Sequence, residues 1–162
     1  RLVGSEMCIR DSYVMNDREY MALAIKEAKK AFLTGEIPIG ALITYNDTII
    51  ASAHNLCERQ NDATCHAEII AIKKASEVLK NWRLTGCTLY VTIEPCLMCT
   101  GAIINSRISR VVYGSRNKQN GGIDSRFNIG KDVLNSDFAV TRNILADDCQ
   151  KLMDLFFQTH RR

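Results

Sequence analysis

Residues 88–104 read Thr88-Leu-Tyr-Val-Thr-Ile-Glu-Pro-Cys-Leu-Met-Cys-Thr-Gly-Ala-Ile-Ile104, and this stretch gives the strongest indication of the fold class. Its first part, residues 88–93, is rich in β-branched and aromatic residues and predicts a strand. Pro95 then opens a predicted helix, because proline is tolerated at the start of a helix but not in its interior. A strand that leads directly into a helix is typical of an α/β fold.

The segments around this stretch alternate between strand-like and helical patterns. Besides the helix opened by Pro95, the predicted helices are 17–35 with Gly35 as its stop, 67–80 and 146–160. Besides 88–93, the predicted strands are 39–45, 48–53, 110–113 and 139–142, with polar loops at 54–64 and 115–131. Asn46-Asp47 suits a tight turn between the first two strands. This order predicts a three-layer α/β/α sandwich around a mixed five-stranded sheet that begins with an antiparallel hairpin.

The composition is typical of one soluble globular domain, with 162 residues that are 46% hydrophobic, 24% charged and 7% aromatic. No apolar run approaches the roughly 20 residues that span a bilayer. Seven cysteines, an odd number, argue against a disulfide framework and favour thiol or metal chemistry in a reducing compartment, which we expect to be the cytoplasm. The net charge of +3 is compatible with an anionic partner.

The N-terminal segment differs from the remainder of the chain. Residues 1–14 have neither a helical nor a strand period, and residues 1–12 are similar to translated sequencing-adapter sequence. We expect residues 1–14 to be a non-native or disordered tail, with Met15 as the natural start. Residues 15–162 contain no repeat, low-complexity run or linker and are expected to form a single domain.

Two short motifs at predicted helix starts carry side chains suited to a metal ion. Cys96 and Cys99 are three residues apart, so both can face one ion from the first turn of a helix. His66 and Glu68 are two residues apart, so they can approach the same centre only if His66 lies at or before the first turn of its helix. One imidazole and two thiolates suit Zn²⁺ and leave a fourth position for water.

The same motifs predict a hydrolytic reaction. Zinc lowers the pKa of a bound water to about 7, and Glu68 is the nearest residue able to move its protons without being a ligand. We therefore expect Glu68 to carry protons from water to the leaving group. The backbone N–H of Ala67 is expected to donate to the substrate base or to the developing tetrahedral centre, because the first N–H groups of a helix lack partners within it.

These motifs and four longer stretches carry a resemblance to a known family. His-Ala-Glu followed by Pro-Cys-x-x-Cys is similar to the signature of the zinc-dependent cytidine and adenosine deaminases. Over residues 17–162 the chain resembles, in particular, the bacterial-type tRNA-specific adenosine deaminases. The stretches are Asp62-Ala-Thr-Cys-His-Ala-Glu-Ile-Ile, Leu89-Tyr-Val-Thr-Ile-Glu-Pro-Cys-Leu-Met-Cys-Thr-Gly-Ala-Ile-Ile, Ser106-Arg-Ile-Ser-Arg-Val-Val-Tyr-Gly and Ile144-Leu-Ala-Asp-Asp-Cys.

The resemblance implies a cytidine-deaminase-like fold in one zinc-dependent deaminase domain, a homodimer, and one Zn²⁺ per subunit bound by His66, Cys96 and Cys99. It implies hydrolytic conversion of the wobble adenosine of a tRNA anticodon to inosine, with release of ammonia and with Glu68 as the general acid and base. Asn55, in the loop before the first motif, matches the family's base-contacting asparagine.

Further RNA contacts are expected from the C-terminal helix and from a basic segment. Phe156 and Phe157, followed by Arg161 and Arg162, match the family's Phe-Phe-basic tail beside the flanking nucleotides. Phe156 continues an apolar helical stripe and is assigned to the core, so Phe157 is the candidate for stacking on a nucleotide. Residues 106–131 indicate an RNA-backbone footprint, because they hold one acid against the basic residues Arg107, Arg110, Arg116, Lys118, Arg126 and Lys131.

Two residues depart from the family's pattern in this segment. The chain has Asn117 and Gln119 where the family often has an Asp and, two residues on, a Lys. Asn117 remains a substrate-binding candidate, and the loss of a negative charge there eases the approach of an RNA backbone. Cys65, directly before His66, is not at a ligand position and is expected to be a buried small side chain.

Two other functions use part of the same residue set. A deaminase of a small free substrate, such as cytosine, guanine or a riboflavin precursor, would share the zinc motif but would not need Phe157, the terminal arginines or the basic segment. A non-catalytic zinc-binding module is disfavoured by the count of three ligands and by the presence of Glu68.

Overall fold

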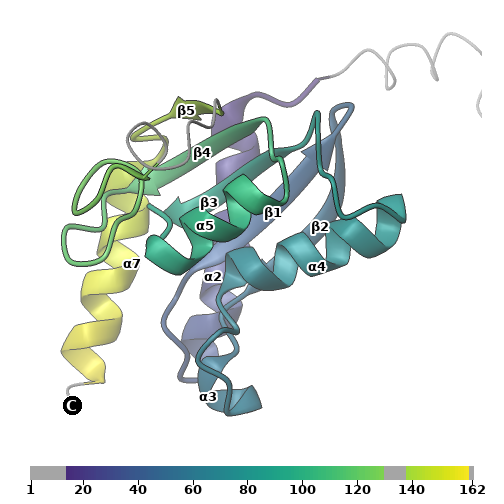
Figure 1. Cartoon of the computed structure of the whole chain (residues 1–162). Coiled ribbons are helices and arrows are strands. Elements are labelled where there is room, and N and C mark those ends of the chain that lie inside the picture. The colour runs from purple at the N-terminus through teal and green to yellow at the C-terminus, as the bar shows by residue number, and fades with distance from the viewer. Residues whose placement is uncertain (1–13, 130–137, 161–162) are drawn as a thin grey trace, which may run out of the picture.

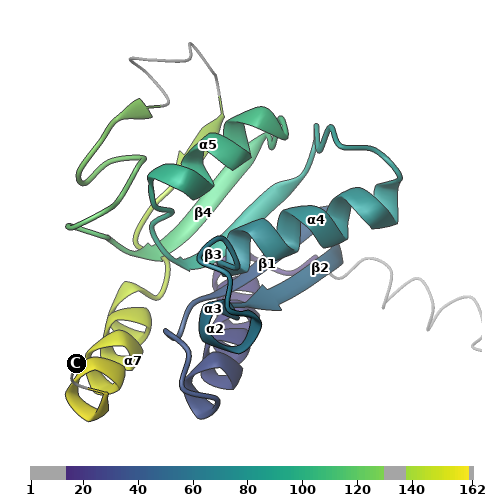
Figure 2. The same ribbon diagram turned by 60° about the horizontal axis from the view of Figure 1, so that its bottom comes forward.

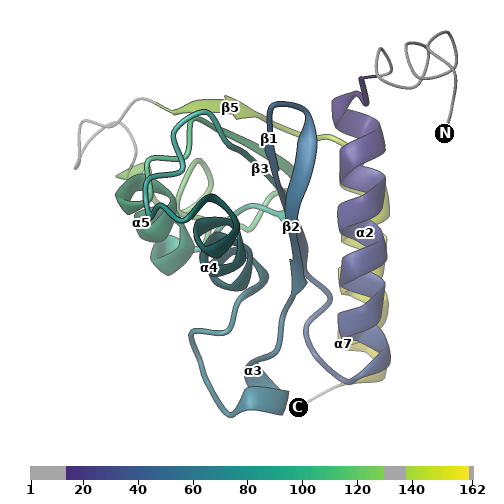
Figure 3. The same cartoon turned by 90° about the vertical axis from the view of Figure 1, so that its right-hand side faces the viewer.

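The computed structural model describes residues 14–129 and 138–160, and its elements form a mixed five-stranded sheet with helices on both faces (Figures 1 and 3). The helices are α2 (Asp17–Leu33), α3 (Cys57–Gln60), α4 (Ala67–Leu79), α5 (Leu97–Asn105) and α7 (Ala146–Thr159). The strands are β1 (Gly40–Tyr45), β2 (Thr48–His54), β3 (Thr88–Ile93), β4 (Arg110–Ser115) and β5 (Ala139–Thr141). Within these two described ranges, no helix is long and apolar enough to cross a membrane.

The sheet runs in the order β2-β1-β3-β4-β5. β1 is antiparallel to both β2 and β3, whereas β3, β4 and β5 are parallel. The predicted hairpin is confirmed, because Tyr45 pairs with Thr48 across a turn in which Asn46 and Asp47 have φ angles of 48° and 61°. Asparagine and aspartate tolerate this left-handed backbone better than most residues.

The predicted three layers are also confirmed (Figure 3): α4 and α5 cover one face of the sheet, and α2 and α7 cover the other. Successive side chains of β3 point to opposite faces of the sheet and so contribute to the hydrophobic core on each face. Leu89 and Val91 pack on the α4 and α5 side, and Tyr90 packs on the α2 side. On α4, the buried residues other than Glu68 are alanines, namely Ala67, Ala71 and Ala75. These small side chains let the helix lie close to the sheet.

Two glycines allow α2 and α7, which cover the same face, to approach the sheet closely. A Cβ atom on Gly40 in β1 would lie 2.0 Å from the Ala24 carbonyl oxygen of α2. A Cβ atom on Gly114 in β4 would lie 2.5 Å from the Cys149 Sγ atom of α7. At these points α2 contacts β1 through its own backbone, and α7 contacts β4 through the Cys149 side chain.

Several element boundaries differ from the sequence prediction. The predicted polar loop after β2 contains the short helix α3, which ends at Asn61 with a φ of 49°. β4 continues to Ser115 because its pairing with β3 extends to Ile93. The helix expected to open at Pro95 begins at Leu97 instead, because the Pro95 carbonyl accepts a hydrogen bond from Gly122 N–H and Cys96 keeps an extended backbone.

Candidate functional site

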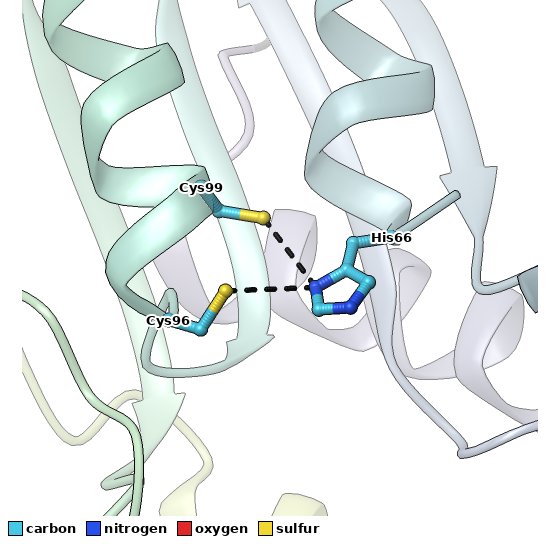
Figure 4. Close-up of side chains that lie close together, drawn as sticks. All are labelled: His66, Cys96 and Cys99. Carbon is cyan, nitrogen blue, oxygen red and sulfur yellow. Dashed lines mark hydrogen bonds between the residues drawn. The ribbon is translucent and has the colours of Figure 1, made fainter. Parts of the chain in front are cut away.

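Three side chains from two helix starts converge at one point (Figure 4). His66 Nδ1 lies 3.6 Å from Cys96 Sγ and 3.6 Å from Cys99 Sγ, and the three ligand atoms all lie within 4.8 Å of one another. His66 comes from the start of α4, and the two cysteines come from the start of α5. The structure therefore brings the predicted ligand set together.

The sheet explains why these helix starts meet. β2 and β3 both run antiparallel to β1, so both end at the same edge of the sheet, and α4 and α5 follow those ends. His66 is the N-cap of α4, with an extended backbone at φ −73° and ψ 151°. This meets the condition that the sequence set for His66 and Glu68 to approach one centre. Cys96 is likewise the N-cap of α5, which places Cys99 in the first turn.

The spacing of the donor atoms fits a tetrahedral zinc ion. Zinc–nitrogen and zinc–sulfur bonds of about 2.05 and 2.3 Å at a tetrahedral angle place the nitrogen and sulfur atoms about 3.6 Å apart. The two His66–cysteine distances are 3.6 Å. The donor set of one imidazole and two thiols also suits this ion.

Glu68 lies beside this cluster without belonging to it. Its side chain is 2% exposed, and among the buried polar atoms of the described residues Oε2 is left without a hydrogen-bond partner. The carboxyl contacts the Cys99 thiol, and burial raises the pKa of Glu68 to about 7. A buried carboxyl that titrates near neutral pH can both accept and release a proton there.

The pKa values of the two cysteines shift in opposite directions. Hydrogen bonds from Cys99 and from His66 lower the pKa of Cys96 to about 4. The pKa of Cys99 is raised, first by its hydrogen bond to Cys96 and then by burial. The hydrogen bond to Cys96 also raises the pKa of His66.

Asn55 and Ala67 are connected in a way that the sequence analysis did not foresee. Asn55 follows β2, is buried, and its Oδ1 accepts a 2.8 Å hydrogen bond from the Ala67 N–H. The expectation that the Ala67 N–H is open to a substrate is therefore corrected, since this donor is taken by Asn55. The contact fixes the orientation of the Asn55 amide at the start of α4.

Glu94 is a buried acid that the sequence analysis missed. Its carboxylate accepts hydrogen bonds from the backbone N–H groups of four loop residues and from the Ser125 hydroxyl; the four are Asn117, Ile123, Asp124 and Ser125. It thereby holds the loop of residues 116–129 beside the start of α5 (Figure 2). Its position directly before Pro95, facing a glycine-rich loop, was the available signal.

Asn117 has a structural partner in this loop. Its Oδ1 accepts a 3.1 Å hydrogen bond from the Asn120 N–H, and its carbonyl accepts one of 2.8 Å from the Gly121 N–H. The residue as a whole is partly exposed. Gln119, the second departure, is exposed in the same loop.

Five of the six basic residues in the predicted footprint are described by the structure, and three of these five lie near the site. Arg110 is not part of an open surface, because it binds Asp17 through two hydrogen bonds of 2.9 and 2.6 Å. Arg107 follows the far end of α5, away from the cysteines. Arg116, Lys118 and Arg126 are exposed after the β4 end that lies near the site. The sixth basic residue, Lys131, lies outside the described residues.

The two phenylalanines of α7 differ in exposure, and Cys65 before α4 is less buried than expected. Phe156 is buried and Phe157 is 50% exposed, as the helical stripe predicted. Arg161 and Arg162 lie outside the described residues. Cys65 is only partly buried, so the expectation of a buried side chain is wrong; it precedes the N-cap of α4 and so lies on the loop side of that helix.

Comparisons with known proteins agree with this geometry. A sequence profile described as the cytidine and deoxycytidylate deaminase zinc-binding region matches residues 14–115. The tRNA-specific adenosine deaminase of Streptococcus pyogenes serotype M1 is 45% identical over 151 residues, which cover 92% of this chain and 88% of that protein.

Solved structures extend the likeness to three dimensions. One, from biochemical and structural studies of A-to-I editing by tRNA:A34 deaminases at the wobble position of transfer RNA, has a TM-score of 0.81 and 35% identity, and covers 83% of this chain and 98% of that chain. A guanine deaminase from Nitrosomonas europaea has a TM-score of 0.77 at 21% identity, covering 89% of this chain and 86% of that chain. At that identity, the second likeness concerns the fold alone.

Proposed function

This chain belongs to the tRNA-specific adenosine deaminases of the cytidine and deoxycytidylate deaminase family, and we propose from this premise that it converts the wobble adenosine of a tRNA anticodon to inosine. The expected cytidine-deaminase-like fold is confirmed by the same comparisons. The observation that carries the proposal is the cluster of His66, Cys96 and Cys99 with the buried, unpartnered Oε2 of Glu68 beside it.

The reaction is a hydrolytic exchange at C6 of the adenine ring. Water adds its oxygen to C6, the bond from C6 to the exocyclic nitrogen breaks, and ammonia leaves with the proton that it needs. The zinc ion, when bound, supplies a Lewis acid that lowers the pKa of water to about 7. Its ligands would be His66, Cys96 and Cys99, and we propose one ion per subunit.

Glu68 moves the protons in this scheme. Its carboxylate takes a proton from the attacking water and gives a proton to the leaving nitrogen. Glu68 is buried beside Cys99, and its Oε2 has no hydrogen-bond partner among the described residues. This oxygen is therefore available to exchange a proton with water and with the leaving nitrogen.

Asn55 orients the base. Because its Oδ1 is held by the Ala67 N–H, its Nδ2 group is the part left to donate to an acceptor on the purine. Asn117 and Phe157 are proposed as contacts to the nucleotides around the wobble position. Phe157 presents half of its surface, which suits stacking on an unpaired base of an anticodon loop.

We propose a homodimer in the cytoplasm. Leu97 and Met98, on the first turn of α5 beside the ligands, are 46% and 37% exposed, and a second copy would cover this apolar pair. The six cysteines of the described residues are all free, which suits a reducing compartment. Light scattering of the zinc-loaded protein tests the dimer, and a monomer at micromolar concentration would contradict it.

The test of function uses an anticodon stem-loop with adenosine at the wobble position. We expect inosine at that position alone, measured by nucleoside mass analysis after digestion. An otherwise identical stem-loop with guanosine at that position is the control. Turnover of free cytosine, guanine or a riboflavin precursor without inosine in the RNA would instead support a small-molecule deaminase.

A further inference from the structure

The loop of residues 116–129 presents an exposed aromatic ring and a cation beside the site. Phe127 is 42% exposed, and the Arg126 guanidinium lies 5.9 Å from the centre of its ring. None of the ion pairs found within residues 14–129 and 138–160 involves Arg126. Neither residue belongs to the motifs that predicted the site, apart from the count of Arg126 as a basic residue.

Backbone pairing connects this pair to a ligand residue. Gly121 forms an antiparallel bridge with Cys96, and the Gly122 N–H donates to the Pro95 carbonyl at 2.8 Å. The Gly121 carbonyl in turn accepts hydrogen bonds from the N–H groups of Arg126 at 3.1 Å and Phe127 at 2.9 Å. Phe127 is thus one backbone hydrogen bond away from the residue that pairs with Cys96.

The loop is held firmly enough to present a preformed surface. The Glu94 carboxylate accepts hydrogen bonds from the Asp124 and Ser125 N–H groups of this loop. A Cβ atom on Gly121 would lie 2.3 Å from Glu94 Oε2, so the loop also packs closely on this side chain. A Cβ atom on Gly122 would lie 2.5 Å from Thr100 Oγ1 of α5. A loop packed this closely loses little further entropy when a ligand binds.

We propose that Phe127 and Arg126 form a stacking contact for a nucleobase that flanks the reacting adenosine. The inference rests on the proposed function, because it takes the ligand to be a single-stranded RNA loop. Unpaired bases stack on aromatic rings and arginine planes, and the guanidinium can also approach the phosphate of the same nucleotide. The contact is distinct from that of Phe157, which lies on α7.

The first experiment compares Phe127 variants on the wobble-adenosine stem-loop. Phe127→Ala is expected to lower kcat/KM by at least about fivefold, as the loss of one stacked base predicts, and Phe127→Trp to keep most of it. Trp82→Ala is the matched control, because Trp82 is also exposed beside an arginine, with Arg83 at 4.2 Å. It follows the far end of the 13-residue α4, about 20 Å from the ligands.

The second experiment identifies the stacked base. Flanking nucleotides of the stem-loop are replaced one at a time by abasic residues and assayed with wild-type enzyme and with Phe127→Ala. One position is expected to lower kcat/KM of the wild type by the same factor as Phe127→Ala, with no further loss when both changes are combined. Independent losses at every position would overturn the proposal, as would a kcat/KM for Phe127→Ala within twofold of wild type while zinc content and Tm are unchanged.

A binding measurement separates this inference from the proposed function. The wild-type chain has one tryptophan, Trp82, so Phe127→Trp combined with Trp82→Phe leaves the introduced indole as the only tryptophan fluorophore. We expect the stem-loop to quench its fluorescence, and the same stem-loop abasic at the identified position to quench it less. If the wild type makes no inosine, the proposed function fails and the quenching alone decides the contact. Absence of quenching at saturating RNA would overturn it.

Discussion

At the scale of single residues, the site contains a group that folding alone does not explain. A buried polar atom without a partner costs about 1–3 kcal/mol, so such atoms are rare away from functional sites. Glu68 Oε2 is such an atom, and it lies beside the His66, Cys96 and Cys99 cluster. Proton transfer between water and the leaving nitrogen gives this oxygen the role that the folded protein leaves open.

Glu68→Gln is therefore expected to keep zinc and lose deamination. The amide preserves the volume but cannot accept and return a proton, and general acid–base catalysis typically contributes about 10²- to 10⁴-fold. Metal analysis and inosine formation measure the two effects on the same preparation. Glu77→Gln, on the exposed face of the same helix, should match wild type. A Glu68→Gln enzyme within tenfold of wild-type kcat would exclude the shuttle role.

At the scale of elements, one ion pair ties the first helix to the sheet. Asp17, in the first turn of α2, binds Arg110 of β4 through two hydrogen bonds and accepts a third, of 2.9 Å, from the Tyr90 hydroxyl of β3. The hydrogen bond from Arg110 holds the pKa of Asp17 below its usual value. A lowered carboxyl pKa stabilises the fold at pH above the unfolded value, and this stabilisation is lost as pH falls through the folded value.

Asp17→Asn is expected to destabilise the protein by about 1 kcal/mol at pH 7, an amount reduced by the partial exposure of the pair. The difference from wild type should shrink below about pH 4, where the unfolded carboxyl becomes protonated. Urea unfolding between pH 7 and pH 3 measures it. Asp47→Asn in the exposed hairpin turn is the matched control for the loss of charge. An Asp17→Asn effect that is equal at both pH values would contradict this account.

The closeness of α2 to β1 is a second property of elements. Gly40→Ala would place a Cβ atom 2.0 Å from the Ala24 carbonyl oxygen, so the helix must shift. We expect a loss of at least about 2 kcal/mol in the free energy of unfolding. Gly101→Ala is the matched control, because its Cβ atom meets nothing within 4 Å, and alanine favours a helix by up to about 1 kcal/mol. Equal unfolding midpoints for the two variants would show that the close approach does not limit stability.

At the scale of the whole molecule, the ligands connect α4 and α5 across one face of the sheet (Figures 2 and 4). His66 contributes from one helix start and the two cysteines from the other, so a bound ion joins segments that are 30 residues apart in the chain. Metal binding to such a site stabilises the folded state, because the unfolded chain lacks the assembled ligands.

Removal of zinc with a chelator is therefore expected to lower Tm by about 10 °C, since about 4 kcal/mol of binding energy is lost and each kcal/mol corresponds to about 2–4 °C at this size. Addition of zinc should restore Tm. Cys96→Ala should lose the metal and should no longer respond to either treatment. Differential scanning calorimetry with parallel metal analysis measures these outcomes. A Cys96→Ala protein that retains a full complement of zinc would contradict the ligand assignment.

The amino-acid sequence alone supported the three-layer fold, the hairpin at Asn46-Asp47 and the candidate metal ligands, because these depend on local periodicity, turn chemistry and spacing along one helix. The two-residue spacing of His66 and Glu68 also required His66 to lie at or before the first turn of its helix. Only the tertiary structure showed that Asn55 accepts the hydrogen bond of the Ala67 N–H and that Arg110 binds Asp17. It also showed that Glu94 holds the loop that carries Phe127. Those contacts join residues far apart in the chain, and no local pattern specifies which partner a buried polar group will find.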